Sequence, residues 1–429
     1  MIRMSTSLRP RHTLTEATRK LAAARGIIVN GPRQAGKSQL LAQLGTDRNA
    51  EVLSLDQPAL LRAARTDPTG FVSNRRRPLL IDEVQRAGNP LVLALKAMLD
   101  SSDETGQVAL AGSTRFLTEP RLSESLAGRV RFVDLWPFAQ GEIDELGVHA
   151  DRFVDTLLSD GARLRDVAGA APGLSRSAIF ERVCCGGFPE AVRIASLRDR
   201  SEFFADYVRT ISQRDIRELG RIGERVELPV VLRALAERTA NLVNAANLAD
   251  AVRLTPETLR RYLPLLETIF LTLTIPAFGD SAAARTRRRP KLYVTDPGLC
   301  AAMLGVSADR LMHPEASMAG SLLETFIATE IIKQLGWSTE QAAVTHFRDA
   351  DGRAVDLVLS TPDGRVAAIE VKAAIDVDER DFRGLAHLRD HLGPRFVNGV
   401  VMHCGHSVGS WGDRLTSVPV SALWTPAPP

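Results

Sequence analysis

Four cysteines and the absence of a long hydrophobic run set the first limits on this 429-residue sequence. The cysteines form no CxxC pair and no closely spaced framework, so we expect a reduced, intracellular chain rather than a disulfide-stabilised one. No apolar stretch reaches the roughly 18 residues that a membrane-spanning helix requires. The N-terminal residues also lack the apolar core of a signal peptide. We therefore expect a cytoplasmic protein with no membrane contact.

A strong excess of charge is lacking as well. Lysine and arginine number 54 against 51 aspartates and glutamates, which leaves a net charge of +3. This balance neither requires nor excludes a nucleic-acid partner, so an electrostatic argument has to rest on local clusters. Hydrophobic residues make up 45% and charged residues 24% of the chain, as in soluble globular proteins. A chain of this length divides into two or three domains.

Residues 1 to about 150 alternate short apolar runs with stretches of helical periodicity. The runs are GIIVNG, EVLSLD, PLLIDE, QVALAG and VRFVDLWP. This alternation predicts βαβ units and a buried parallel sheet with flanking helices. The patterns from about 176 to 280 are mostly helical, and those from about 315 predict a helix, three strands, a helix and a strand. The fold class expected for the whole chain is α/β.

The octapeptide GPRQAGKS matches the phosphate-loop pattern G-x-x-x-x-G-K-S/T from Gly31 to Ser38. The glycines let backbone N–H groups turn toward a phosphate, and the start of the following helix adds partial positive charge. In such a loop Lys37 reaches the β- and γ-phosphates, and the Ser38 hydroxyl binds Mg²⁺. The residues predicted to bind the nucleotide are Gly31, Pro32, Arg33, Gln34, Ala35, Gly36, Lys37, Ser38 and Gln39.

A second motif follows about 45 residues downstream, where RPLLIDEV places Asp82 and Glu83 at the end of an apolar strand. A strand-end aspartate holds Mg²⁺ in phosphate-loop sites. A neighbouring glutamate is suited to accept a proton from the attacking water. We therefore predict that Asp82 is a metal ligand and that Glu83 is the catalytic base, together with Lys37 as a catalytic residue.

The next predicted strands end or begin with further polar residues. VALAGSTRFL ends with Ser113, Thr114 and Arg115, and a polar group at this position can sense the γ-phosphate or orient water. Arg129 and Arg131 flank the strand that follows. Arginine offered to a nucleotide stabilises transition-state charge, while arginines beside a strand are also common on solvated faces. Ser113 and Arg129 are carried forward as candidates for nucleotide binding.

Several motifs together resemble a known family. GPRQAGKS, LLIDEVQR, LAGSTRF and LWPFAQGE, in this order, resemble the AAA-type ATPases of prokaryotes. GGFPEAV, YVRTISQRDI, LRRYLPLLE and KLYVTDPGL resemble the domain of unknown function (DUF4143) to which that family is joined. The resemblance extends over residues 20 to 425. It implies ATP and Mg²⁺ as ligands and, because AAA-type ATPases often act as rings, a possible homo-oligomer.

The middle of the chain has the pattern of a winged helix-turn-helix. Thr255 is expected to cap a helix that begins with Pro256 and packs Leu259, Tyr262, Leu263 and Leu266 inward. That arrangement leaves three arginines near the surface, where they are able to meet phosphates. These are Arg253, Arg260 and Arg261. Winged-helix modules also serve for packing alone, and both interpretations stay open.

The C-terminal part carries a set of acidic residues and a lysine. Glu324 lies on an apolar helix face, Asp356 lies on a predicted strand, and Glu370 and Lys372 share one face of the next strand. This order resembles the PD-(D/E)xK restriction-endonuclease-like fold. The resemblance implies that Glu324, Asp356 and Glu370 bind Mg²⁺ and that Asp356, Glu370 and Lys372 act in cleavage. Ala354 stands where that family commonly has an acidic residue.

We therefore expect three domains: a P-loop ATPase over 1–175, a helical region with a winged helix over 176–284, and a nuclease-like domain over 285–429. The expected function is hydrolysis of MgATP coupled to the binding or processing of nucleic acid, DNA rather than RNA. The alternatives are an ATP-driven switch that binds protein or nucleic acid without cutting it, and a nucleotide-binding module that does not hydrolyse.

Overall fold

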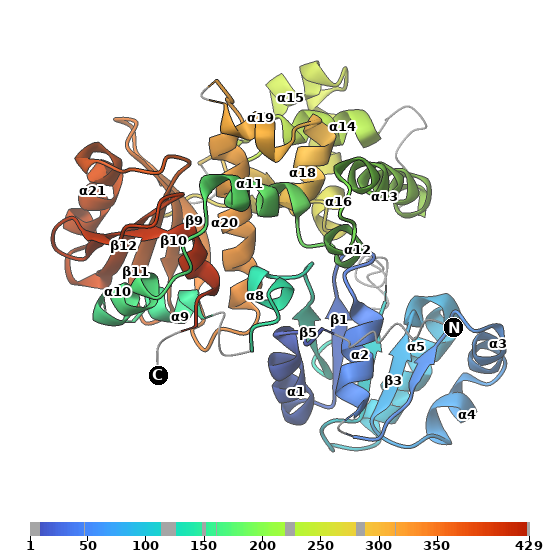
Figure 1. Cartoon of the computed structure of the whole chain (residues 1–429). Helices are drawn as coiled ribbons and strands as arrows, with labels where there is room; N and C mark the ends of the chain where they lie inside the picture. The colour runs from blue at the N-terminus through green and yellow to red at the C-terminus, as the bar shows by residue number, and fades with distance from the viewer. Residues whose placement is uncertain are drawn as a thin grey trace, which may run out of the picture.

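The computed structural model describes residues 9–46, 48–112, 126–147, 152–159, 161–218, 228–279, 288–313 and 315–426. These residues form an N-terminal module, which we call the ATPase module after the sequence prediction, a largely helical middle module and a C-terminal α/β module (Figure 1). No helix in the described ranges is both long and apolar enough to cross a membrane.

The ATPase module is built on a five-stranded parallel sheet, as the alternating sequence pattern predicts. Its strands lie in the order β2-β3-β4-β1-β5, and every pairing between neighbours is parallel. The carboxyl ends of all five strands therefore meet at one edge. The strands are β1 (Gly26–Asn30), β2 (Val52–Ser54), β3 (Leu79–Asp82), β4 (Val108–Ala111) and β5 (Val130–Asp134).

Helices cover both faces of this sheet. Residues of α1 and α2 pack on one face with Ile27 and Val29, while α3, α4 and α5 pack on the other with Ile28 and Ile81. Because strand residues alternate between faces, the continuous apolar runs supply both cores. The helices are α1 (Thr13–Ala23), α2 (Lys37–Thr46), α3 (Pro58–Thr66), α4 (Pro68–Ser73), the 3-10 turn η1 (Val84–Ala87) and α5 (Asn89–Asp100).

The middle module combines helices with a small antiparallel sheet in the order β6-β8-β7. Thr255 caps α16 by accepting from Thr258 N, with Pro256 at the first helical position, as predicted. The elements are α11 (Arg176–Cys185), α12 (Pro189–Arg193), α13 (Leu197–Glu218), α14 (Leu228–Ala236), β6 (Asn241–Leu242), α15 (Ala245–Ala251), α16 (Pro256–Thr268), β7 (Thr272–Ile275), β8 (Lys291–Val294), α18 (Pro297–Leu304) and α19 (Ala308–Met312).

The predicted boundary between residues 284 and 285 is wrong. It separates β7 from β8, although these strands pair through four residues from Thr272–Val294 to Ile275–Lys291. The helices that follow, α18 and α19, pack against α11 and α14. The middle module therefore extends through α19, because the strand that completes its sheet, β8, begins only at Lys291.

The C-terminal module is a six-stranded sheet in the order β13-β14-β12-β11-β10-β9. Helix α20 packs on one face and α21 on the other, which matches the predicted helix, three strands, helix and strand. The elements are α20 (Ala319–Leu335), β9 (Ala343–Arg348), β10 (Ala354–Ser360), β11 (Val366–Lys372), η2 (Glu379–Phe382), α21 (Arg383–Leu392), η3 (Gly393–Arg395), β12 (Phe396–His403), β13 (Gly409–Ser410), β14 (Leu415–Pro419) and η4 (Val420–Trp424).

Two helices that the sequence assigned to the ATPase domain complete this C-terminal module instead. Helices α9 (Phe153–Leu157) and α10 (Gly161–Gly169) contact α20, β14 and η4 and lie beneath the C-terminal sheet in Figure 1. Asn398 on β12 donates to Leu157 O at 2.8 Å and to Ser159 O at 3.0 Å. The predicted ATPase domain of 1–175 is thus too long at its C-terminal end. The apolar face of α9 and α10 is buried by a sheet some 200 residues later in the chain.

Candidate functional site

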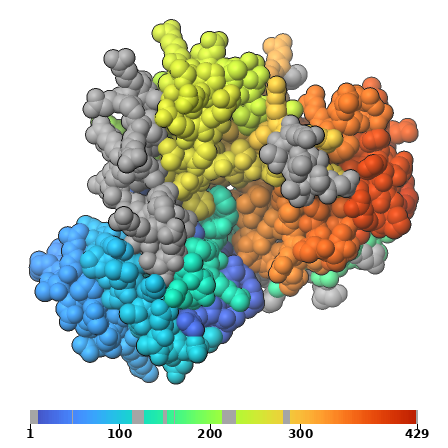
Figure 2. All heavy atoms as spheres, turned by 180° about the vertical axis from the view of Figure 1, so that it is seen from behind, coloured from blue at the N-terminus to red at the C-terminus, as the bar shows by residue number. Residues whose placement is uncertain are grey.

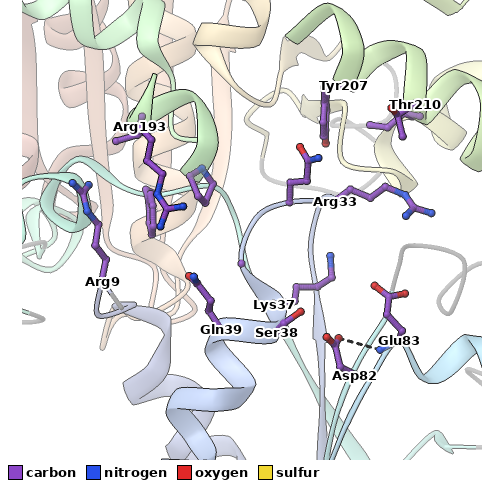
Figure 3. A pocket seen from close by; sticks show the side chains of 16 residues that line it. Arg9, Arg33, Lys37, Ser38, Gln39, Asp82, Glu83, Arg193, Tyr207 and Thr210 are labelled. Atoms are coloured by element: carbon purple, nitrogen blue, oxygen red, sulfur yellow. Dashed lines mark hydrogen bonds between the residues drawn. The ribbon is translucent and has the colours of Figure 1, made fainter. Parts of the chain in front are cut away.

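A cavity of about 500 Å³ opens at the carboxyl edge of the ATPase sheet. Lys37, Ser38, Asp82 and Glu83 line its ATPase side, and Tyr207 of α13 lies on the opposite side (Figure 3). The cavity therefore lies between two modules. Its ATPase wall is assembled from the loop after β1 and the end of β3.

The phosphate loop is shaped by close backbone contacts. A Cβ atom at Gly31 would lie 2.1 Å from Leu135 O, so only glycine fits at the start of the loop. Lys37 opens α2, and its side chain is buried. Its Nζ donates to Gly31 O at 2.9 Å and to Pro32 O at 2.8 Å. The lysine charge is thus held over the loop at the N-terminus of a helix.

The carboxylates at the end of β3 are arranged through an unusual backbone conformation. Glu83 has φ 53°, in the left-handed region that costs a residue with a side chain about 1–3 kcal/mol. The Glu83 N–H donates to Asp82 Oδ1 at 3.0 Å, and Gln85 Nε2 donates to the Glu83 carboxylate. The sharp turn directs both carboxylates to the cavity (Figure 3). Such strain persists at sites where the surrounding structure imposes it.

The middle module supplies the other wall of the cavity. Arg193, at the end of α12, and Tyr207 and Thr210 of α13 line it. Arg9, from the segment before α1, lines it as well. The sequence analysis missed these residues because they lie outside the phosphate-loop motifs. The nearest available signal was GGFPEAV, which precedes Arg193 directly.

The predicted nucleotide-binding residues divide into three groups. Those that line the cavity are Arg33, Gln34, Gly36, Lys37, Ser38 and Gln39. Gly31, Pro32 and Ala35 contribute backbone atoms, of which Gly31 O and Pro32 O accept from Lys37 and Ala35 O accepts from Arg11. Ser113 lies outside the described residues.

The candidate Arg129 requires a correction, because the structure does not bring it to the cavity of its own chain. Arg129 directly precedes β5, at the amino edge of the sheet, whereas the cavity lies at the carboxyl edge. Its guanidinium pairs with Asp100 at the end of α5, with 3.0 Å between Nη2 and Oδ2. This pair raises the pKa of Arg129 and lowers the pKa of Asp100. Arg129 therefore lies at the edge of the sheet opposite the cavity.

A buried arginine holds the phosphate loop from behind. Arg11 is 2% exposed and donates to Ala35 O and to Trp136 O, each at 2.6 Å. Its Nε donates to Glu142 Oε1 at 3.0 Å. Although burial works in the opposite direction, the positive charges of Arg11 and His12 lower the pKa of Glu142. The loop is thereby tied to the segment that follows β5.

That segment, residues 136–142, also contacts the C-terminal module. Glu330 of α20 accepts from Gln140 N at 2.9 Å, and Lys333 Nζ donates to Phe138 O at 2.9 Å. Glu330 and Lys333 pair with each other at 2.7 Å, and both are buried. Figure 2 shows the teal residues after β5 where the blue, yellow and orange modules meet.

The middle module contacts the same segment through a glycine. Phe138 N donates to Gly187 O at 2.7 Å, and a Cβ atom at Gly187 would lie 2.3 Å from Phe138 O. Asp296, which is fully buried, accepts from Gly187 N at 2.8 Å. Segment 136–142 therefore has direct hydrogen bonds to all three modules.

The predicted acidic residues of the C-terminal module also lie together, but a lysine stands among them. Lys291 Nζ of β8 lies 2.8 Å from Glu324 Oε1 and 2.8 Å from Asp356 Oδ1. Lys372 Nζ lies 3.0 Å from Glu370 Oε1. The sequence analysis assigned no role to Lys291. Its role was not visible because its partners are 33 and 65 residues away.

The predicted metal ligands Glu324, Asp356 and Glu370 are not arranged as a metal site. No group of three or more such side chains with metal-binding geometry occurs in the described ranges. Burial, with the charge of Asp356, raises the pKa of Glu324 to about 8 and also raises the pKa of Glu370. Lys291 lies between Glu324 and Asp356, so the geometry of these residues does not match the predicted Mg²⁺ site.

Family models match three successive parts of the chain. Residues 23–144 match an AAA domain, residues 176–310 match a domain of unknown function (DUF8612), and residues 319–423 match another domain of unknown function (DUF4143). Together with the parallel sheet and the phosphate loop, the first match shows that residues 23–144 are similar to AAA domains. The predicted combination of AAA and DUF4143 matches is confirmed. The four motifs that we assigned to DUF4143, however, fall within the DUF8612 match over residues 176–310.

The relatives include uncharacterized proteins of Mycobacterium tuberculosis and Mycobacterium bovis. Each is 28% identical over 335 residues, which covers 76% of this chain and 67% of the relative. An uncharacterized protein of Haemophilus influenzae is 21% identical over 333 residues, 75% of this chain and 72% of the relative.

Two solved structures are similar at lower identity. The Walker-type ATPase of Pyrococcus abyssi is 15% identical, with 67% of this chain and 94% of that chain covered and a TM-score of 0.38. The RuvB Holliday junction branch migration motor of Thermotoga maritima is 17% identical, with 66% and 95% covered and a TM-score of 0.28.

Proposed function

We propose that this chain hydrolyses MgATP and uses the reaction as a switch that moves its C-terminal module on a macromolecular partner. The observation that carries this proposal is the cavity that joins Lys37, Asp82 and Glu83 to helices of the middle module. The proposal corresponds to the non-cleaving alternative of the sequence analysis, because the C-terminal acidic residues do not form a metal site.

The charge and size of the cavity suit a nucleoside triphosphate. The lining residues include four cations, Arg9, Arg33, Lys37 and Arg193, and two anions, Asp82 and Glu83. Arg9 also pairs with Glu145 and Arg193 with Glu190, so the positive charge offered to a phosphate comes mainly from Lys37 and the N-terminus of α2. A volume of about 500 Å³ also falls within the range of about 300–1,000 Å³ typical of small-molecule sites.

The roles within the cavity follow from position. Backbone N–H groups at the start of α2 and the Lys37 ammonium bind the β- and γ-phosphates. When bound with the nucleotide, Mg²⁺ neutralises phosphate charge, and Ser38 and Asp82 are the residues placed to hold it. Glu83 accepts a proton from the water that attacks the γ-phosphate, which yields ADP and phosphate.

The switch follows from what surrounds the cavity. A nucleotide bound between Lys37 and Arg193 contacts both the ATPase and the middle module. Behind the loop, Arg11 connects Ala35 O to Glu142, and segment 136–142 connects in turn to Glu330 and Lys333 of α20. A change at the γ-phosphate therefore has a continuous hydrogen-bonded route to the helix that carries Glu324.

Nucleic acid, DNA rather than RNA, is the partner proposed for the moving modules. The order α14-β6-α15-α16-β7-β8 supports a winged helix in the middle module, and Arg253, Arg260 and Arg261 are exposed there. The α20-β9-β10-β11-α21-β12 order supports a nuclease-like scaffold. We propose that this scaffold binds without cutting. We also propose that several copies of the chain assemble into a ring and that the protein is cytoplasmic.

The first experiment measures phosphate release by the wild type with Mg²⁺ and ATP, with and without duplex DNA and single-stranded RNA. Activity that DNA stimulates supports the proposal, and loss of that activity in Lys37→Met assigns it to this cavity. Lys96→Met on α5 is the matched control and should retain activity. Absence of hydrolysis under all these conditions would contradict the proposal and favour a module that only binds nucleotide.

The coupling is tested separately by hydrogen exchange of α20. Glu83→Gln with ATP and the wild type with ADP should differ in exchange across α20. Lys333→Met should remove this difference while leaving nucleotide affinity unchanged. Identical exchange of α20 in the ATP-bound and ADP-bound forms would contradict the switch, whatever the rate of hydrolysis.

A further inference from the structure

Two side chains of the middle module enter the acidic cluster of the C-terminal module. Lys291 and Tyr293 lie on β8, which pairs with β6 and β7. Besides the two Lys291 contacts described above, Tyr293 Oη donates to Glu324 Oε1 at 2.7 Å. Glu324 Oε1 therefore accepts from two donors that belong to a different module.

The cluster is largely closed to solvent. The side chains of Lys291 and Glu324 are each 12% exposed, and that of Asp356 is 16% exposed. An ammonium at this depth is stable only when carboxylates compensate its charge, and the carboxylates in turn need a cation. Removing either partner therefore leaves an uncompensated charge in a partly desolvated place.

A divalent cation that bridged Glu324 and Asp356 would have to lie between the same two oxygens that Lys291 contacts. The second oxygen of Asp356 is also engaged, since it accepts from Val371 N at 3.0 Å. Glu370 Oε1 is held by Lys372, and Glu370 Oε2 is buried without a hydrogen-bond partner among the described residues. The carboxylate oxygens left for a metal are Glu370 Oε2 and Glu324 Oε2. The latter belongs to the carboxylate that Lys291 contacts, so a divalent cation there would meet the like charge of the ammonium.

We infer that Lys291 is the resident cation of this cluster and holds the place between Glu324 and Asp356 that a metal ion would need. The cluster is then a metal-free joint between the middle and C-terminal modules. The residues that resemble a nuclease site serve to attach β8 to α20 and β10. This inference is independent of whether the ATPase cavity hydrolyses ATP.

The inference is tested by counting Mn²⁺ bound to the full-length protein without nucleotide, using the EPR signal of free Mn²⁺. Asp82→Asn is present in every variant so that the ATPase cavity contributes equally. The background protein and its Asp356→Asn form should bind the same number of ions. Lys291→Met should bind one more, and the double variant Lys291→Met/Asp356→Asn should lose it again.

Two results would overturn the inference. One is a bound Mn²⁺ in the background protein that disappears with Asp356→Asn, because the cluster would then be a metal site despite Lys291. The other is a folded Lys291→Met protein that gains no Mn²⁺. If Lys291→Met does not fold, the inference is tested by comparing the Mn²⁺ bound to the background protein with the Mn²⁺ bound to its Asp356→Asn form. If Asp356→Asn does not fold either, Glu324→Gln takes its place in this comparison.

The contribution of the joint to stability is measured separately, by thermal unfolding. Lys291→Met should lower the thermal unfolding midpoint by several degrees, because about 1 kcal/mol shifts a midpoint by roughly 2–4 °C in larger domains. Lys291→Arg should lower the midpoint less. The control Lys96→Met should leave the midpoint within a degree of the wild type. EDTA should not change the midpoint of the wild type. An unchanged midpoint in Lys291→Met, or a fall with EDTA, would contradict a metal-free joint.

Discussion

The ATPase cavity and the acidic cluster of the C-terminal module both combine carboxylates with a lysine, yet the lysine has opposite surroundings. Lys37 donates to two backbone carbonyl groups, Gly31 O and Pro32 O. Lys291 pairs with two carboxylates. Carbonyl groups orient an ammonium without cancelling its charge, so Lys37 still attracts a phosphate. Carboxylates cancel the charge, so Lys291 has no such effect on its surroundings.

The carboxylates differ in the same way. Within the described residues, neither Asp82 nor Glu83 forms an ion pair with a cationic side chain, and both line an open cavity. Glu324 and Asp356 share one ammonium in a closed cluster. The comparison teaches that residue types alone do not distinguish a ligand site from a structural joint. The two are distinguished by the groups that the lysine contacts, which are carbonyl groups in one case and carboxylates in the other.

The largest expected effect comes from removing the cation of the open site. Lys37→Met should reduce ATP hydrolysis by about 10²–10³-fold or more, the range found when one preorganised group that stabilises transition-state charge is lost. The thermal midpoint should change by no more than a few degrees, because the hydrogen bonds from Lys37 to Gly31 O and Pro32 O stay within one loop. Steady-state phosphate release and differential scanning fluorimetry measure the two quantities. A large fall in stability with hydrolysis intact would reverse the comparison.

Glu83→Gln should separate binding from chemistry in the same cavity. The amide keeps the size and the hydrogen bond of the side chain but accepts no proton, so turnover should fall by about 10²–10⁴-fold. Affinity for a fluorescent ATP analogue should change less than about threefold, which corresponds to about 0.7 kcal/mol at room temperature. Equal losses in affinity and turnover would show that Glu83 binds substrate rather than activates water.

The buried pair behind the loop should have a smaller effect on catalysis and a larger one on stability. Arg11→Met leaves Glu142 buried without its cation, and breaking such a pair costs about 3–5 kcal/mol. Urea unfolding followed by tryptophan fluorescence should show the loss. The double variant Arg11→Met/Glu142→Gln should recover part of it, since no buried charge remains. A double variant less stable than Arg11→Met would contradict this account.

The same pair predicts a dependence on pH. The pKa of Glu142 is lowered from its ordinary value of 4.5 in the folded protein. Its contribution to stability is therefore fully present above about pH 4.5 and is lost as the pH falls through the lower, folded pKa. The stability difference between the wild type and Glu142→Gln should narrow below about pH 4.5. A difference that stays constant from pH 7 to pH 3.5 would remove Glu142 as its source.

The smallest effect is expected at Arg129. Its pair with Asp100 lies at the amino edge of the sheet and is exposed, so Arg129→Ala should change neither stability nor ATP hydrolysis measurably in dilute protein. A loss of hydrolysis that appears only as the protein concentration rises would show that a neighbouring copy uses this arginine.

The sequence predicted contiguous features well and distant ones poorly. Gly31 to Ser38 and the Asp82–Glu83 pair are each encoded in one short stretch, where a strand, a turn and a helix follow one another. The ammonium of Lys291 and the guanidinium of Arg11 have partners up to 131 residues away. No local periodicity reports such a contact, because it depends on the packing of whole modules.

The error at Arg129 has a different origin. The residue precedes a predicted strand, and the direction of parallel strands in the sheet was enough to place it at the edge opposite Asp82. The domain boundaries failed for a third reason. β8 and the pair α9–α10 pack with modules on the far side of a sequence boundary, so a linear division of the chain cannot represent them.

The position of α9 and α10 has a consequence for how the chain is made. The ribosome completes α10 at residue 169, whereas the strand β14 that it contacts ends at residue 419. At translation rates of about 5–20 residues per second, this interval of 250 residues lasts roughly 12–50 s. During that time the apolar face of α9 and α10 is outside the exit tunnel but has no C-terminal sheet to pack against. A nascent chain of this protein should therefore depend on chaperones until its last strands emerge.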